Sequence, residues 1–353
     1  MAQEARRTTL REVAAAAGVS LGTASNAFNR PELVSTRSRE RVLAAARSLG
    51  YRGPDPAARH LRTGTSGALG LVFTDRLEYA FGDPAAVIFL RGISEGIRGR
   101  GAGLLIVPTT PSRNESRRVV REALVDGFIL YSAPDHDPRV EAVIERQLPA
   151  VVVDQPRGLP FPFIGIDDRE AARTAAAHLR ELRHERFLVL AFVDAALSDP
   201  RLRYQVTAAR LAGYRDGLGE GWAHADVERC RPNSVERGEA VALEALARPE
   251  RPTAILAMSD ALALGARRAA ERLGIAVPAE LSIVGFDDSP LALLSDPPLT
   301  TVSQPTEEKG RLAAEQLLAA LEEGSPPPRS ETILETRLVV RDSTAPAPAG
   351  ATA

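Results

Sequence analysis

The chain of 353 residues contains little cysteine, little lysine and few aromatic side chains, and it has no long apolar run. A single cysteine, Cys230, excludes a disulfide framework or a zinc site of several cysteines, and is typical of the reducing cytoplasm. No run of 18 apolar residues is present, which excludes a membrane-spanning helix, and the N-terminal residues lack the apolar region of a signal peptide. Lys309 is the one lysine among 44 basic residues, which we interpret as coding bias. The sequence therefore predicts a cytoplasmic protein that has no contact with a membrane.

Charge is divided unevenly along the chain. Residues 1–65 hold 11 arginines and 5 acidic residues, a net charge of +6, whereas the remainder carries −8. The length is too great for one ordinary core and suits a small module attached to a larger body. A basic head on an acidic body indicates that the head binds a polyanion.

The head has the pattern of three short helices. Residues 10–17 place apolar side chains at i, i+3, i+4 and i+7, and Gly18 ends this helix. Ser20 is suited to cap a second helix over residues 21–28, and Ser35 to cap a third. Two helices joined by a short glycine-containing turn predict a helix-turn-helix, whose second helix enters the major groove of DNA.

From Ala68 onward, short apolar runs alternate with amphipathic segments of helix length. Such alternation predicts an α/β body of parallel sheets flanked by helices, and its length favours two lobes. The expected strands are Leu69–Phe73, Leu104–Val107, Phe128–Tyr131, Val151–Val153, Phe163–Ile166, Phe187–Phe192, Ala254–Ala257 and Ile283–Phe286. The expected helices include Val87–Arg98, Ser116–Leu124, Arg169–Leu182, Leu202–Leu218, Ala261–Leu273 and Arg311–Leu321.

Catalytic and metal-binding signatures are weak. Gly92–Gly96 reads G-x-S-x-G but lies within a helical pattern, whereas a hydrolase nucleophile needs a strand before it and a helix after it. The histidines lack the spacing of metal ligands, and Cys230 is most simply a packed small residue. We therefore predict no catalytic residue, no metal, no cofactor and no enzyme activity.

Ordered motifs along nearly the whole chain resemble the lactose-repressor/galactose-repressor (LacI/GalR) family. In the head they are Thr9–Ala14, Ala17–Ser20, Thr23–Ser25, Val34-Ser35 and Leu49–Tyr51, followed by Ala58–Gly64. In the body they are Pro252–Ile255, Ser259–Gly265, Val284–Asp288 and Pro298–Val302. The resemblance implies an N-terminal helix-turn-helix DNA-binding head, a hinge helix and a two-lobed, periplasmic-binding-protein-like body.

The resemblance also implies which head residues contact DNA. Leu21, Gly22 and Asn26 fall at positions that read bases, and an asparagine can pair with adenine where an arginine would favour guanine. Seven further side chains occupy positions that reach phosphates, although Ser20 and Ser35 can also serve as helix caps. These seven are Thr9, Ser20, Thr23, Ser25, Asn29, Ser35 and Arg39.

In the hinge, the implied contacts are Ala58, Leu61 and Arg62. Leu61 matches the leucine that this family inserts into the minor groove, where it unstacks a base step and kinks the duplex. Packing of Leu61 on the body is the alternative, and its cationic neighbours favour DNA.

The body is implied to hold a small molecule between its lobes. Six residues match cleft positions or their neighbours, namely Asp154, Arg210, Asn233, Ser259, Asp260 and Asp287. Arginine donors combined with carboxylate acceptors suit a hydroxyl-rich ligand. For Arg210 the alternative is a charge on a helix surface.

These inferences define an expected organisation. We predict a DNA-binding domain over 8–53, a hinge helix and linker over 54–67, an effector-binding and dimerisation domain over 68–340, and a disordered tail over 341–353. Lobe 1 is expected at about 68–164 and 291–325, and lobe 2 at about 165–290 and 326–340.

The expected function is a transcriptional repressor that binds a pseudopalindromic operator as a homodimer. A small polar effector, with a sugar among the candidates, is expected to switch it. Two alternatives stay open: an activator or corepressor-dependent repressor of the same architecture, and a ligand-binding α/β protein whose basic head binds DNA nonspecifically.

Overall fold

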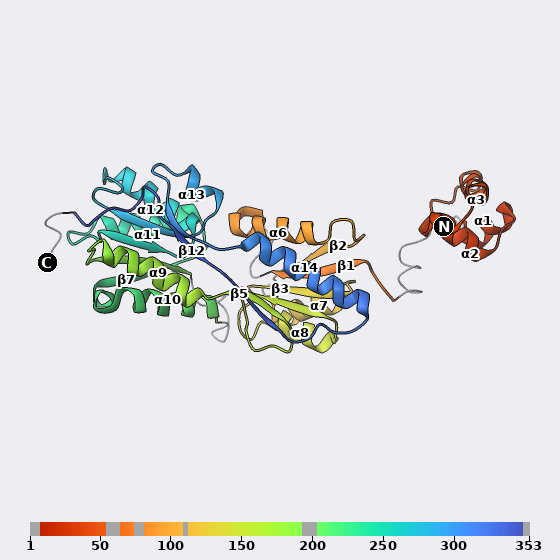
Figure 1. Ribbon diagram of the computed structural model, residues 1–353, viewed down its shortest axis with the longest axis horizontal. Helices are drawn as coiled ribbons and strands as arrows, with labels where there is room; N and C mark the ends of the chain where they lie inside the picture. The colour runs from red at the N-terminus through yellow and green to blue at the C-terminus, as the bar shows by residue number, and fades with distance from the viewer. Residues whose placement is uncertain (1–7, 54–63, 74–80, 109–111, 193–202, 349–353) are drawn as a thin grey trace. The chain divides into compact units, whose positions relative to one another are not determined.

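The computed structural model describes residues 8–53, 64–73, 81–108, 112–192 and 203–348 of the chain. It divides into two compact units, residues 1–66 and 67–353 (Figure 1). The predicted hinge contacts Ala58, Leu61 and Arg62 lie outside the described residues.

The first unit is a bundle of short helices, as the sequence predicts. It consists of α1 (Leu10–Ala17), α2 (Leu21–Asn29), a 3-10 turn (Pro31–Leu33) and α3 (Thr36–Ser48). Each α-helix begins at a side-chain cap, and Gly18 ends α1 in the left-handed region at φ 60°. The three helices bury one small core, built from Val13, Ala14, Ala17, Ala24, Ala27, Val42 and Ala46.

Lobe 1 of the second unit is a six-stranded parallel sheet between two layers of helices. Its strand order is β11-β5-β4-β3-β1-β2. Helices α6 and α14 cover one face of the sheet, and α7 and α8 cover the other. Its elements are β1 (Ala68–Phe73), α6 (Pro84–Gly96), β2 (Gly103–Val107), α7 (Arg113–Glu122), β3 (Gly127–Tyr131), α8 (Pro138–Arg146), β4 (Ala150–Val153), β5 (Phe163–Ile166), α14 (Thr306–Glu323) and β11 (Glu331–Leu334).

Lobe 2 has the same layers around a six-stranded sheet of order β12-β10-β9-β8-β6-β7, in which β12 pairs antiparallel with β10 and the other pairs are parallel. Helices α9 and α10 pack on one face of the sheet, and α11 and α12 on the other. Its elements are α9 (Asp168–Glu181), β6 (Phe187–Phe192), α10 (Gln205–Leu218), a 3-10 turn (Gly219–His224), β7 (Ala225–Cys230), α11 (Val235–Leu246), β8 (Ala254–Ala257), α12 (Asp260–Arg272), β9 (Ser282–Asp287), α13 (Pro290–Leu294), β10 (Thr300–Ser303) and β12 (Arg337–Val339).

The predicted boundaries of the lobes are wrong in their C-terminal parts. Residues 291–325 were expected in lobe 1, but β10 within them pairs in parallel with β9 and belongs to lobe 2. Residues 326–340 were expected in lobe 2, but β11 within them pairs in parallel with β5 and belongs to lobe 1. The chain therefore returns to lobe 1 after β10 and to lobe 2 after β11. These crossings depend on long-range strand pairing, which a local pattern does not reveal.

The predicted disordered tail is also wrong for residues 341–348. Ser343 is fully buried, and its hydroxyl donates to the carbonyl of Ile283 at 2.6 Å. The same hydroxyl accepts from the backbone N–H of Thr300 at 2.8 Å. The segment continues from β12 and satisfies backbone groups of β9 and β10, so its simple composition conceals an ordered packing role. Residues 349–353 lie outside the described part.

The G-x-S-x-G string lies within α6, as expected for a chance match. Gly92 and Gly96 face α14, where a side chain at Gly92 would place its Cβ 1.9 Å from the carbonyl oxygen of Glu307. These glycines allow α6 and α14 to approach each other closely. Their role is therefore in helix packing.

Within the described ranges, no helix is long and apolar enough to cross a membrane.

Candidate functional site

The ten predicted DNA-contacting residues that the structure describes are all exposed or half-buried on the head. Leu21, at the start of α2, leaves 47% of its surface exposed although it is a large apolar side chain. Ser20 and Ser35 cap α2 and α3, so their predicted capping role is confirmed. Within α2, Ala24 and Ala27 are buried in the core and the half-buried Phe28 packs against it, so the other residues of the helix form an accessible surface.

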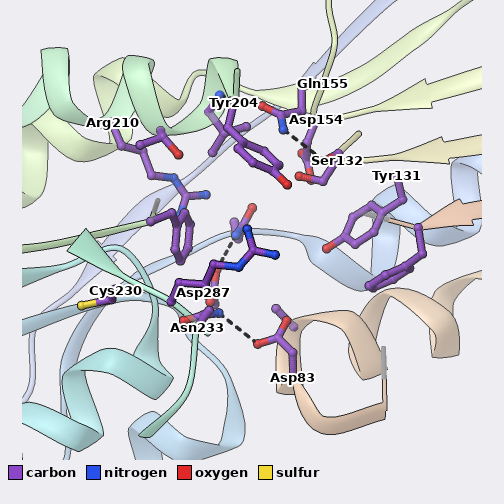
Figure 2. A pocket seen from close by; sticks show the side chains of 17 residues that line it. Asp83, Tyr131, Ser132, Asp154, Gln155, Tyr204, Arg210, Cys230, Asn233 and Asp287 are labelled. Carbon is purple, nitrogen blue, oxygen red and sulfur yellow. Dashed lines mark hydrogen bonds between the residues drawn. The ribbon is translucent and has the colours of Figure 1, made fainter. Parts of the chain in front are cut away.

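A cavity of about 140 Å³ lies between the two lobes of the body. Figure 2 shows its wall, with Arg210, Asn233 and Asp287 from lobe 2 opposite Tyr131 and Asp154 from lobe 1. Four of the six predicted cleft residues therefore line one cavity, namely Asp154, Arg210, Asn233 and Asp287. The topology explains this convergence, because Asp154 and Asp287 stand at the carboxyl ends of β4 and β9, where ligands of open parallel sheets bind.

Arg210 projects from α10 and is 5% exposed. Its Nε donates to Asp168 at 2.8 Å and its Nη1 donates to the carbonyl of Met258 at 2.7 Å. The guanidinium lies 3.6 Å from the ring centroid of Phe286, a stacking arrangement suited to its planar cation. Burial by itself would lower the pKa of Arg210, but the charges of Asp168 and Asp287 raise it, so this buried group stays a cation. Its alternative as a surface helix charge is wrong.

A chain of side-chain hydrogen bonds joins the two cavity carboxylates. The ammonium of Lys309 donates to Asp154 and to the amide oxygen of Gln304, each at 2.6 Å. The Nε2 of Gln304 then donates to Asp287 at 2.6 Å. Because Gln304 must accept from Lys309, its N–H₂ group faces Asp287. The single lysine of the chain therefore connects the two cavity carboxylates through Gln304. The interpretation of this residue as coding bias did not predict that role.

Asp287 is a carboxyl group of the cavity with a raised pKa. Burial raises its pKa well above the usual value, and the neighbouring Asp260 raises it further, while Arg210 opposes both. Its backbone has φ 114°, and Asp154 has φ 64°, so both carboxylates sit on backbone conformations that L residues rarely adopt. Strain of this kind is commonly retained at ligand-binding positions.

Asn233 and Ser259 belong to a chain of hydrogen bonds that joins lobe 2 to lobe 1. Asn233 donates to Asp83 of lobe 1 at 3.3 Å and accepts from Ser259 at 2.5 Å. Ser259 also caps α12, and it does not line the cavity. Its predicted position in the cleft is therefore corrected to a supporting one behind Asn233.

Asp260 has no place in the cavity wall either. It is 1% exposed and accepts from the hydroxyl of Thr301 and the backbone N–H of Ser289, each at 2.6 Å. These bonds connect α12 to β10 and to the turn after β9. Asp260 was expected at the ligand because it follows Ser259 in the motif, but its side chain points into the core of lobe 2.

Several cavity residues were not predicted from the sequence. They include Phe73, Tyr131, Ser132, Gln155, Phe192, Tyr204, Thr207 and Gln304. Tyr131 stacks on Phe89 with ring centroids 3.8 Å apart and forms one aromatic side of the cavity. These residues lie at or just after the ends of strands, or at the starts of helices. Their position at these ends is the one sequence signal that could have indicated that they line the cavity.

Neither a nucleophile nor a metal cluster emerges from the described residues. Cys230 lines the cavity, but burial raises the pKa of its thiol to about 11, so it is not a thiolate at neutral pH. Among the described histidines, cysteines and carboxylates, no group of three could hold a metal ion.

A helical head and a two-lobed body with a polar cavity between its lobes define a ligand-responsive DNA-binding protein. Comparison with known proteins specifies this class. Residues 9–53 match the model of bacterial regulatory proteins of the lacI family, and residues 176–344 match that of a periplasmic binding protein-like domain. An HTH-type transcriptional regulator of Mycolicibacterium smegmatis is 40% identical, over 98% of each chain.

Two solved structures extend the likeness. The Lac repressor dimer bound to operator and the anti-inducer ONPF has a TM-score of 0.78 at 29% identity, and the match covers 96% of this chain and 100% of that one. The complex of the transcriptional regulator CelR with cellobiose has a TM-score of 0.68 at 30% identity, with the same coverage. The chain belongs to the lacI family, and it is a DNA-binding transcriptional regulator.

Proposed function

We propose that the protein is a repressor that binds a pseudopalindromic operator as a homodimer and is switched by a small polar effector. The observation that carries this proposal is the cavity between the lobes, where a fixed arginine lies near two carboxylates. A guanidinium donor and carboxylate acceptors together satisfy the hydroxyl groups of a sugar. The relative that binds cellobiose supports this chemical class. We assign the protein no catalytic step, and we place its action in the cytoplasm.

We further propose that the helix-turn-helix over 8–53 reads the operator and that the segment 54–67 is the hinge. Leu21, Gly22 and Asn26 would face bases, and the exposed polar residues around them would contact phosphates. Within the body, Asp154, Arg210, Asn233 and Asp287 would hold the effector, while Ser259 and Asp260 would support them.

Selection of bound sequences from a random DNA pool tests the function. We expect a pseudopalindrome with two half-sites, because one head makes too few base contacts for specificity. The selection is repeated with sugars and polyols, and an effector that releases the DNA identifies a repressor. An effector that strengthens binding identifies a corepressor-dependent regulator. Binding without sequence preference would contradict the proposal.

The hinge supplies a prediction of its own. Replacing Leu61 with alanine is expected to weaken binding to the selected operator by about 2 kcal/mol, because the apolar wedge and the DNA bend are lost. Nonspecific DNA, which phosphate contacts hold, is expected to bind almost unchanged. The measurement is fluorescence anisotropy on both DNAs. Equal losses on both would assign Leu61 to packing.

The dimer surface gives another prediction. On the body, α13 exposes Leu293 and Leu294 by 63% and 81%, and α6 exposes Val87 by 46%. Figure 1 shows α6 and α13 along one edge of the body. The adjacent exposed leucines of α13 form a continuous apolar surface of the kind at which proteins associate, and we propose a second copy of the chain as their partner. Replacing Leu294 with glutamate is expected to weaken dimerisation at least tenfold.

Sedimentation velocity measures this change over a range of protein concentrations. Leu124, which is 67% exposed after α7, provides the control as Leu124→Glu. The control is expected to leave the dimer intact. A parent protein that stays monomeric, or a Leu294 variant that dimerises like the control, would overturn the assignment of this surface.

A further inference from the structure

One hydroxyl in the cavity wall is buried without a hydrogen-bond partner. Thr207 lies in the first turn of α10, is 1% exposed and lines the cavity. Its Oγ1 contacts no donor or acceptor in the part of the chain that the structure describes. Burying a hydroxyl unpaired is unfavourable, and a valine of nearly the same shape would avoid it.

The local structure explains why the helix does not satisfy this hydroxyl. A threonine within a helix commonly donates to the carbonyl four residues earlier, and Thr174 of α9 does so to Glu170 at 3.0 Å. For Thr207 that carbonyl belongs to Arg203, and it already accepts from the backbone N–H of Asp135 at 2.8 Å. Arg203 precedes the helix, a loop of lobe 1 binds its carbonyl, and the Thr207 hydroxyl makes no hydrogen bond to it.

Lobe 1 also fixes the orientation of this first turn. The backbone N–H of Val206 donates to the side chain of Gln155 at 2.9 Å, and Gln205 donates to Asp135 at 2.8 Å. These bonds hold the N-terminus of α10 against the cavity. Thr207 is thereby kept at the wall, one turn before Arg210.

Thr207 and Arg210 form a pair on one face of α10, because residues three apart in a helix are neighbours. Arg210 has five N–H donors, and its hydrogen bonds to Asp168 and Met258 use its Nε and one hydrogen of Nη1. We propose that Thr207 is a specificity-determining contact of the effector site: its hydroxyl and the guanidinium of Arg210 bind neighbouring hydroxyl groups of one effector. The effector is thus a sugar or polyol with a vicinal diol. This inference rests on the proposed function of the cavity.

The first measurement needs no effector. Thr207→Val in the full chain removes only the hydroxyl, so we expect its Tm to equal that of the parent or to exceed it by about 1–3 °C. Thr174→Val is the matched control, because it removes a hydroxyl that has a partner in a helix away from the cavity. A Tm of Thr207→Val clearly below that of the control would show that the hydroxyl has a structural partner, and would overturn the inference.

The second measurement uses cellobiose, D-glucose, D-ribose and D-mannitol as probes, each tested by thermal shift and then by calorimetry. For a probe that binds the parent, we expect Thr207→Val to raise Kd at least tenfold and Thr207→Ser to stay within threefold. Monodeoxy analogues of that probe add a direct test of contact. The parent is expected to reject one of them at least tenfold, and Thr207→Val to discriminate against it less than twofold.

The two proposals fail in different ways. A parent that binds none of the probes contradicts the sugar or polyol effector and the diol together. A parent that binds a probe with a Thr207→Val variant of equal affinity contradicts the role of Thr207 alone. Loss of affinity in Thr207→Val with retained Tm, and its recovery in Thr207→Ser, supports both.

Discussion

Replacing Arg210 with alanine is expected to weaken effector binding by about 2–4 kcal/mol, because the buried polar groups of the effector then lose a charged partner. The effector can change operator affinity only through its differential affinity for two arrangements of the lobes. The variant should therefore bind operator nearly as the parent does, yet ignore effector at concentrations that switch the parent. In a corepressor-dependent regulator, the same variant should fail to repress.

The structure adds a requirement to this test. Arg210 is also the partner of Asp168, and burial raises the pKa of that carboxyl while the charge of Arg210 opposes the change. Removing Arg210 leaves a buried carboxyl without its cation, which destabilises lobe 2. The Tm of the variant must therefore be measured together with effector affinity, and operator binding shows that the head is folded.

Two variants sharpen the interpretation. Arg215→Ala removes an exposed cation from the same helix and is expected to retain effector affinity. Asp287→Ala removes an acceptor from the same lobe 2 wall of the cavity and is expected to lose affinity as Arg210→Ala does. Calorimetry provides the measurement. An Arg210→Ala protein that keeps the affinity of the parent would exclude this residue from the effector site.

The parts of the fold that the sequence predicted are those whose signal is local. Strands such as β3 and β8 are apolar throughout because both faces of a parallel sheet are buried. Strand β7 was missed, because it is an edge strand whose residues are mostly exposed, and its sequence Ala-Asp-Val-Glu-Arg-Cys carries no apolar run. The residues of β10 and β11 were not predicted as strands and were placed in the wrong lobes. Strand β11 pairs with the distant β5, whereas β10 pairs with the preceding strand β9, but its sequence Thr-Thr-Val-Ser carries no apolar run.

The residues of the site likewise fall into those that the sequence indicated and those that it did not. The resemblance to the family located Asp154, Arg210, Asn233 and Asp287, which the structure brings to one cavity. It did not indicate that Asp260 serves the core, because neighbouring residues in a motif can point in opposite directions. Lys309 could not be interpreted from its surroundings, since its partner Asp154 is 155 positions away. A buried lysine and an exposed one look alike in a sequence.

The close contact between α6 and α14 predicts a large loss of stability when a side chain is added at Gly92. A Cβ at Gly92 would lie 1.9 Å from the carbonyl oxygen of Glu307 and 3.0 Å from the backbone nitrogen of Arg311. Both obstacles are backbone atoms, so no side-chain rotation relieves the overlap, and the helices must separate. Gly310 faces α6 in the same way, with its Cβ position 2.3 Å from the carbonyl oxygen of Phe89.

Replacing Gly92 with alanine is therefore expected to lower the free energy of unfolding by about 3 kcal/mol, although alanine favours a helix more than glycine does. The corresponding fall in Tm is about 6–12 °C, measured by calorimetry. Gly82→Ala is the matched control, because no atom lies within 4 Å of its Cβ position. Since α14 also carries Lys309, which holds Asp154, the separated helices should weaken effector binding as well. A Gly92 variant as stable as the Gly82 control would show that α6 and α14 do not pack at the observed distance.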